Sequence, residues 1–208
     1  MKIELKKIEF NERMSEETNC FSADLYINGK HVGEASNRGH GGPTDYQSFN
    51  DEGHTLIKQA EAYCKTLPPY TYEMSGETHS IDMDLEMHID NLLTGYLQDK
   101  ELQKFRKSME RAMVKGLVIG KPDVSFDAIN FKVPLETIMA APNKPEVMVN
   151  IIKKYVIPEL ADGKILLNTN IPDTFLEQAG LTKNQYLPFK KMETNIMKSN
   201  LRKGKSIK

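Results

Sequence analysis

Apolar residues recur at close to every second position over 2–10, with one slip in the alternation, and this pattern predicts a β-strand. A polar connection follows, and then two apolar segments, 20–27 and 30–36, flank the dipeptide Asn28-Gly29. Asn-Gly is well suited to a type I′ hairpin turn, because both turn residues must take positive φ. The opening of the chain therefore predicts a three-stranded antiparallel meander, whose apolar face needs a cover.

A helix predicted at about 52–65 can supply this cover. We place Asp51 as its N-cap, and Leu67-Pro68-Pro69 stops it. Its apolar residues recur at helical spacing: Leu56, Ile57, Ala60 and Cys64. We predict a first unit that covers 1–77, with its boundary near residues 67–77.

Residues 80–90 allow two interpretations with different chemistry. As a strand, they would align acidic side chains and one imidazole, a ligand set suited to a hard metal ion: Asp82, Asp84, Glu86, His88 and Asp90. As a helix from about Leu85, they would place the acids at a helix N-terminus, where the helix dipole favours them. We predict a short strand that hands over to a helix near residue 84, and this arrangement scatters the carboxylates.

Helical periodicity continues through 99–116, and the sequence leaves open a break near Gly95 to Lys100. The predicted buried stripe consists of Leu102, Phe105, Met109 and Met113, and the predicted outer face of Lys104, Arg106, Lys107 and Arg111. Gly116 is placed at the helix C-cap. Beyond it, the pattern predicts strands at 117–119, 124–133 and 164–168, and helices at 144–157 and 172–180. We therefore predict an α+β protein, in which a mixed helical and stranded half (78–193) and a basic tail (194–208) follow the meander.

The composition is that of an ordinary soluble globular chain, with 208 residues of which 39% are hydrophobic and 27% charged. No stretch reaches the roughly 18 apolar residues of a membrane helix, and the N-terminus lacks a signal-peptide core. The two cysteines, Cys20 and Cys64, lie far apart without a C-x-x-C pattern, as is typical of a reducing compartment. We expect a cytoplasmic protein with no membrane contact.

The formal net charge of −1 hides a division between the two halves of the chain. Residues 1–99 carry 8 Lys or Arg and 18 Asp or Glu, whereas residues 100–208 carry 20 and 11. A basic half can hold nucleic acid, or it can simply attract the acidic half. The sequence alone leaves both interpretations open.

A glycine-rich loop follows the third predicted strand. Its glycines and proline forbid regular structure and can turn successive backbone N–H groups inward to form an anion-binding nest. The loop lacks the strand, turn and helix context of a P-loop or dinucleotide fingerprint, so the glycines can also serve only to turn a tight corner. The candidate ligand-binding residues are Asn37, Arg38, Gly39, His40, Gly41, Gly42, Thr44, Asp45 and Tyr46.

Two basic segments are candidate contacts for a phosphate backbone. One is the outer face of the helix over 99–116, and the other is the tail, which has no acidic residue from Thr194 onward. Either segment can also be merely solvated. The candidate residues are Lys104, Lys107 and Arg111 in the helix and Lys198, Arg202, Lys203 and Lys205 in the tail.

Few residue patterns support catalysis. The chain has no G-x-S-x-G nucleophile elbow, no activated-cysteine signature and no His-x₃-His spacing. A metal-dependent phosphodiesterase is an alternative, and its candidate ligands are His40, Asp45, His54, Asp82, Asp84, Glu86 and His88. We expect no cofactor.

Several short runs stand out in the first quarter of the chain: Ser15-Glu16-Glu17-Thr18, Phe21 to Lys30, Val32-Gly33, Asn37, Gly39 and Gly41-Gly42. This pattern resembles the opening of a set of small uncharacterised proteins found in bacterial genomes, phages and mobile elements. The resemblance implies a bacterial or phage cytosolic setting and assigns no catalytic residue.

We therefore expect a non-catalytic binding protein of a phage or mobile element, whose partner is an anionic small molecule, a nucleic acid or a host protein. The glycine-rich loop and the basic half would hold a nucleotide or nucleic acid. A protein-interaction module or inhibitor that acts on a host factor is the alternative. The sequence leaves open whether the chain forms a homo-oligomer.

Overall fold

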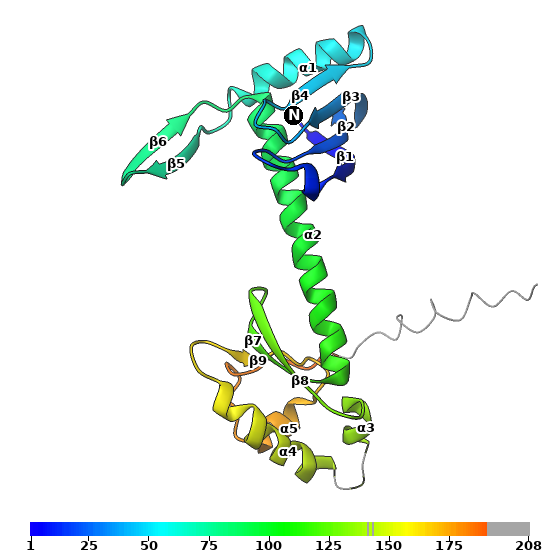
Figure 1. The fold of residues 1–208 in the computed structure, drawn as a ribbon, viewed down its shortest axis with the longest axis vertical. Coiled ribbons are helices and arrows are strands. Elements are labelled where there is room, and N and C mark those ends of the chain that lie inside the picture. Colours follow the sequence, from blue (N-terminus) through cyan, green and yellow to red (C-terminus); the bar gives the residue numbers. More distant parts are fainter. Residues whose placement is uncertain (141, 143, 191–208) are drawn as a thin grey trace, which may run out of the picture. The chain divides into compact units, whose positions relative to one another are not determined.

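The computed structural model describes residues 1–140, 142 and 144–190 (Figure 1). The predicted α+β class is confirmed, because an antiparallel four-stranded sheet comes first and helices and further strands follow. The chain divides into two compact units, Met1–Lys100 and Glu101–Lys208. Among the described residues, no helix combines the length and the apolar character that crossing a membrane requires.

The first unit is built on the predicted meander, extended by one strand that the sequence pattern did not predict. Neighbouring strands pair antiparallel in the order β1-β2-β3-β4. The Asn28-Gly29 turn between β2 and β3 is confirmed, with φ values of 50° and 82°. The strands are β1 Ile3–Phe10, β2 Phe21–Ile27, β3 Lys30–Asn37 and β4 Asp45–Ser48, and a short 3-10 helix, η1 Glu12–Met14, follows β1.

The slip in the alternation of β1 is a β-bulge. Lys6 pairs with Asp24 and Glu9 pairs with Ser22, so three steps along β1 match two steps along β2. Lys7, inside the bulge, takes a φ of 48°. The extra residue returns the apolar side chains on both sides of the slip to the same face of the sheet.

Two helices cover the apolar face of this sheet. The first, α1, covers Asp51–Cys64 and begins after Asn50, whose side-chain oxygen accepts a hydrogen bond from the Gly53 N–H at 2.8 Å. The prediction of Asp51 as the N-cap is wrong by one residue, because Asn50 has the extended backbone of a cap and Asp51 is already helical. The second helix, α2, covers Leu85–Lys115. The core combines Ile3, Phe21, Ala23, Leu25, Ile27, Val32 and Ala35 of the sheet with Ile57, Ala60 and Cys64 of α1 and Leu85, Ile89 and Leu93 of α2.

A hairpin that the sequence pattern did not predict lies between α1 and α2 along the chain. It consists of β5, Tyr70–Met74, and β6, Glu77–Ile81, which pair antiparallel. The predicted start of a helix near residue 84 is confirmed, because α2 begins at Leu85, whereas the short strand predicted before it from residue 80 overlaps β6 only at Ser80 and Ile81. The helix then continues without a break near Gly95.

The second unit is built around β7, Gly116–Lys121, which pairs with β8 on one side and β9 on the other. Helix α2 ends at Lys115, so the predicted end of the helix near Gly116 is confirmed, and Gly116 is also the first residue of β7. Glycine is required there because a Cβ atom would lie 1.9 Å from the Ile129 carbonyl oxygen of β8. The other elements are β8 Ser125–Asn130, β9 Ile165–Leu166, α3 Leu135–Met139, α4 Lys144–Tyr155, η2 Ile157–Glu159 and α5 Asp173–Gln178.

Asn168 fastens the central strand of this second sheet. Its fully buried side chain accepts from the Val118 N–H at 2.7 Å and donates to the Gly116 carbonyl oxygen at 3.0 Å. It also donates to Asn170 Oδ1 at 2.9 Å. The amide thus continues, with side-chain atoms, the ladder that the short strand β9 begins.

Replacing Asn168 by alanine leaves two buried backbone groups of β7 without partners. We expect N168A to lower the free energy of unfolding by about 2–3 kcal/mol. Chemical denaturation followed by far-UV circular dichroism measures the change. The control N150A alters an exposed position of α4 and should stay within about 0.5 kcal/mol. Equal effects of the two substitutions would show that the buried amide is dispensable.

Candidate functional site

The glycine-rich loop is organised by the side chain of Asn37, which is buried at the end of β3. Its Oδ1 atom accepts from Thr18 Oγ1 at 2.8 Å and from the Gly39 N–H at 2.9 Å. Its Nδ2 atom donates to the Gly42 carbonyl oxygen at 2.9 Å and lies 3.3 Å from Thr44 Oγ1. One amide therefore joins both sides of the loop to the segment before β2.

That segment also binds the loop through its backbone. The Gly39 carbonyl oxygen accepts from the consecutive N–H groups of Glu16, Glu17 and Thr18, at 2.9, 3.0 and 3.4 Å. The Gly41 N–H donates to Thr18 Oγ1 at 3.3 Å. The segments 15–18 and 37–42, which both belong to the N-terminal pattern quoted above, are thus in contact in the fold.

Thr44 connects the other end of the loop to the first turns of α2. Its N–H donates to Glu86 Oε1 at 3.0 Å, and its hydroxyl donates to Asp90 Oδ1 at 2.7 Å. Burial raises the pKa of the Asp90 carboxyl, the hydrogen bond from Thr44 opposes this shift, and the charges of Glu86 and Asp84 add to it. Asp90 thus lies in surroundings that disfavour the charged form of its carboxyl group.

Tyr46, on β4 directly after the loop, also contacts an acidic side chain. Its hydroxyl donates to Glu61 Oε1 of α1 at 2.9 Å. Burial, together with this hydrogen bond and the negative charge of Glu61, raises the pKa of Tyr46 to about 12. The phenol therefore stays protonated and acts as a hydrogen-bond donor.

The hydrogen bonds around the loop bear on the predicted anion site. The N–H groups of Gly39, Gly41 and Thr44 all donate to oxygen atoms of the protein. Among the predicted side-chain donors, His40 lies 3.2 Å from a carboxylate oxygen of Glu16, and Arg38 is exposed. An anion at this loop would meet carboxylates, so the geometry favours the interpretation that the glycines turn a tight corner. Ligand binding by the loop stays a prediction.

The alternative metal site finds no support in the described part of the chain, where no group of three or more His, Cys, Asp or Glu side chains could hold a metal ion. Helix α2 separates the acids of 80–90. Asp84 accepts from the Met87 N–H at 2.8 Å at the start of the helix, while Glu86 and Asp90 bind Thr44. Burial lowers the pKa of His88, and His54 is exposed on α1.

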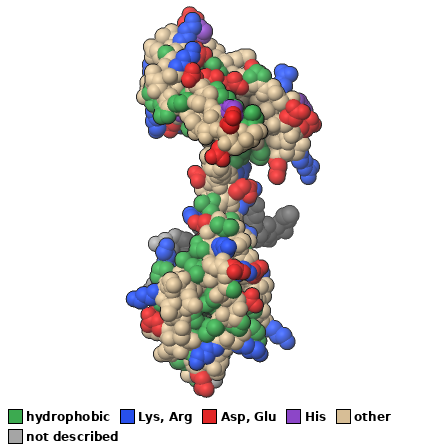
Figure 2. Space-filling model, turned by 90° about the vertical axis from the view of Figure 1, so that its left-hand side faces the viewer, with side chains coloured by type: hydrophobic (Ala, Val, Ile, Leu, Met, Phe, Trp, Pro, Cys, Tyr) green, Lys and Arg blue, Asp and Glu red, His purple; other side chains and the backbone are tan. Residues whose placement is uncertain are grey.

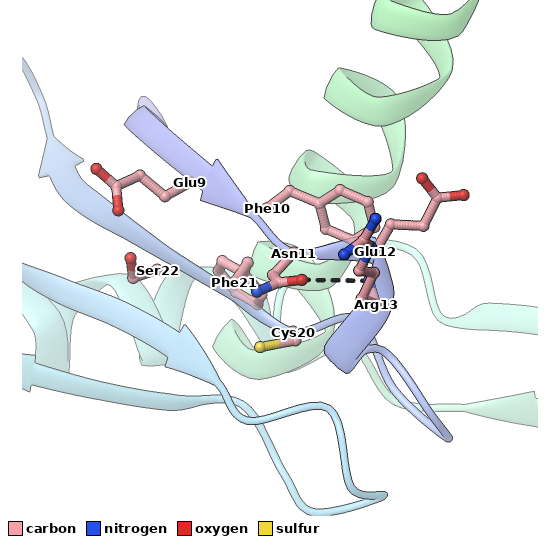
Figure 3. Close-up of a pocket in the computed structure, with 8 residues that line it drawn as sticks. All are labelled: Glu9, Phe10, Asn11, Glu12, Arg13, Cys20, Phe21 and Ser22. Atoms are coloured by element: carbon pink, nitrogen blue, oxygen red, sulfur yellow. Dashed lines mark hydrogen bonds between the residues drawn. The ribbon is translucent and has the colours of Figure 1, made fainter.

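A hollow of about 610 Å³ lies where β1 ends and β2 begins (Figure 3). Its lining carries both signs of charge, from Glu9, Glu12 and Arg13, beside the aromatic rings of Phe10 and Phe21. The Cys20 side chain also lies at this hollow. This mixture selects for no single class of ligand.

The basic face of α2 is the remaining candidate site. Lys104, Lys107 and Arg111 are all exposed, as predicted, and Lys115 joins them one turn further on. At 3.6 residues per turn, these four positions lie within about 80° of the helix circumference. The opposite side carries the predicted apolar stripe, in which Leu102, Phe105 and Met109 are half-buried and Met113 is buried.

The neighbours of this basic face define its extent. Lys104 pairs with Glu101 at 2.5 Å. Arg106, which was predicted on the same outer face, forms a bidentate pair with Asp123 at 2.8 and 2.6 Å. Among the described residues, Lys107, Arg111 and Lys115 have no ion-pair partner. The helical spacing of Lys104, Lys107 and Arg111 predicted this face, and the structure adds Lys115 to it.

No family model, curated protein or solved structure matches the chain. The resemblance of the N-terminal quarter therefore stays a prediction. The predicted tail contacts Lys198, Arg202, Lys203 and Lys205 lie outside the described residues.

Substitutions at two glycines of the loop, Gly39 and Gly42, can test how tightly the loop is packed. At Gly39, φ is +89° and a Cβ atom would lie 2.0 Å from the Met14 carbonyl oxygen, whereas at Gly42 nothing lies within 4 Å. We expect G39A to lower the free energy of unfolding by roughly 2 kcal/mol or more. The matched variant G42A should change it by less than about 0.5 kcal/mol. Chemical denaturation compares the two, and similar values would contradict the described packing.

The environment of Asp90 makes the free energy of unfolding depend on pH. Because the pKa of Asp90 is raised above 3.8, the folded state binds the proton more tightly than the unfolded state. Asp90 therefore costs stability at neutral pH, and this cost disappears as the pH falls through the raised pKa toward 3.8. We expect D90N, whose amide oxygen can still accept from Thr44, to be more stable at neutral pH and to lose part of this pH dependence.

Urea denaturation at a series of pH values measures this effect. The control D99N changes an exposed carboxylate of the same helix. If D90N and D99N have the same pH profile, the buried charge of Asp90 is not the cause.

Proposed function

We propose that the chain is a non-catalytic binding protein that holds a nucleic-acid backbone on the basic face of α2. The supporting observation is the single-sign set of Lys104, Lys107, Arg111 and Lys115 on one side of a continuous helix. Elsewhere on the second unit, on the side drawn in Figure 2, acidic and basic side chains are interspersed. The glycine-rich loop, with carboxylates around it, supports anion binding less well.

The chemistry of this face matches a phosphate backbone. The four side chains extend over about 16 Å of helix, so they can reach several phosphates of one strand, which are about 3.4 Å apart along the duplex axis. Glu101 and Glu110 border the face and limit it to a narrow strip. Lysine and arginine contacts of this kind position a nucleic acid without reading its sequence. We therefore propose sequence-independent, salt-sensitive binding.

We also propose a source and a cellular compartment for the protein. The resemblance of the N-terminal quarter supports a phage or mobile-element protein, and the wide spacing of Cys20 and Cys64 supports the bacterial cytoplasm.

Fluorescence anisotropy with a labelled 20-base-pair duplex and a labelled 20-nucleotide single strand tests the proposal. At low salt we expect the double variant K107E/R111E to weaken binding by at least about tenfold. The slope of log affinity against log salt concentration should also fall by about two.

The double variant K153E/K183E is the matched control, since it changes the net charge equally at exposed positions away from α2. It should alter affinity by less than about threefold, because only long-range attraction is lost. Equal weakening by both pairs, or no binding of either nucleic acid at low salt, would contradict the proposal.

A further inference from the structure

The β5–β6 hairpin is an arm of the first unit (Figure 1). Its strands pack chiefly against each other, and none of their ten residues is buried. An isolated two-stranded hairpin is marginally stable in water, because it has no third element on which to bury a face. The exposed faces of the arm are therefore candidate binding surfaces for another molecule.

One face of the arm is mainly apolar and aromatic, and it also carries His79 and, next to the turn, Glu77. The register pairs Tyr70 with Ile81, Tyr72 with His79 and Met74 with Glu77, and paired residues lie on the same face. Tyr70, Met74 and Ile81 are 46%, 55% and 46% exposed. The rings of Tyr72 and His79 stack with centroids 5.4 Å apart. The other face is polar throughout and carries Thr71, Glu73, Thr78 and Ser80.

Charge narrows the class of molecule that this face can bind. Residues 66–99, which contain the arm, include seven Asp or Glu and no Lys or Arg. Two of these acids lie on the arm itself, Glu77 on its apolar face and Glu73 on the opposite face. A nucleic acid or an anionic membrane would be repelled, and a second copy would bring two acidic arms together. A protein surface with lysine and arginine around an apolar patch has the complementary charge.

We propose that the Tyr70–Tyr72–Met74–Ile81 face of the arm binds a protein partner whose apolar patch is rimmed by lysine and arginine. Tyrosine and methionine are enriched in protein interfaces, where they provide large contact areas. The outer edges of β5 and β6 also carry backbone groups that can pair with a strand of the partner. This inference is independent of nucleic-acid binding by α2.

A peptide library can test the partner chemistry without a known partner. Random 16-residue peptides displayed on phage are selected on the immobilised full-length chain. We expect the selected peptides to combine apolar residues with lysine or arginine. Selection of acidic or purely polar sequences, or no enrichment at all, would overturn the proposal.

Two hairpin variants then locate the binding site. Y70T/M74T removes two apolar side chains of the proposed face, and it should weaken binding of the selected peptides by at least tenfold. Threonine at both positions still favours a strand. T71V/T78V changes the opposite face and should leave binding within threefold. Amide chemical shifts of Ser75 and Gly76 show whether the turn persists in each variant. Equal effects of the two variants, with both turns intact, would overturn the proposal.

Sedimentation of the full-length chain tests the competing occupant. We expect no self-association that depends on the arm. A dimer that Y70T/M74T dissociates would show that a second copy occupies the face and would overturn the proposal.

Discussion

The first unit depends on covering the apolar face of its four-stranded sheet. A single short helix does not suffice, and Ile57, Ala60 and Cys64 of α1 share the core with Leu85, Ile89 and Leu93 of α2. This requirement fixes where α2 begins and how it is rotated about its axis. Between the two covering helices the chain forms the β5–β6 hairpin, in which no strand residue is buried among the described residues. Much of what the chain can present to partners follows from this one burial.

The start of α2 also sets the electrostatics of the glycine-rich loop. Glu86 and Asp90 are four residues apart, so they lie on the same side of the helix and both reach Thr44. The hydrogen bonds that complete the loop therefore bring negative charge beside a backbone that could otherwise have attracted an anion. The buried Asn37 side chain forms hydrogen bonds with the Gly39 N–H and the Gly42 carbonyl oxygen. Hydrogen bonds within the protein therefore use the N–H groups of the loop that an anion would need, which is why we place the proposed anion site on the basic face of α2.

Binding surfaces of opposite character result from this segregation of charge. The stretch 66–99 lacks lysine and arginine, whereas the outer side of α2 from Lys104 to Lys115 gathers four cations. We propose phosphate as the ligand of the basic face and an apolar patch with a cationic rim as the partner of the arm. A formal net charge of −1 is compatible with both proposals, because charge acts locally through screened interactions of limited range.

The sequence by itself determined the features that depend on neighbours along the chain. The alternation of β1 with its bulge, the Asn28-Gly29 turn, the helix beginning near residue 84 and the basic face of α2 all follow from local periodicity. Tertiary structure decided the features that depend on distant residues. Gly116 lies against the Ile129 carbonyl oxygen, Thr44 binds Asp90, and Tyr70, Met74 and Ile81 of the hairpin are exposed among the described residues. No local pattern encodes these contacts, because each is set by which surfaces remain after the cores have formed.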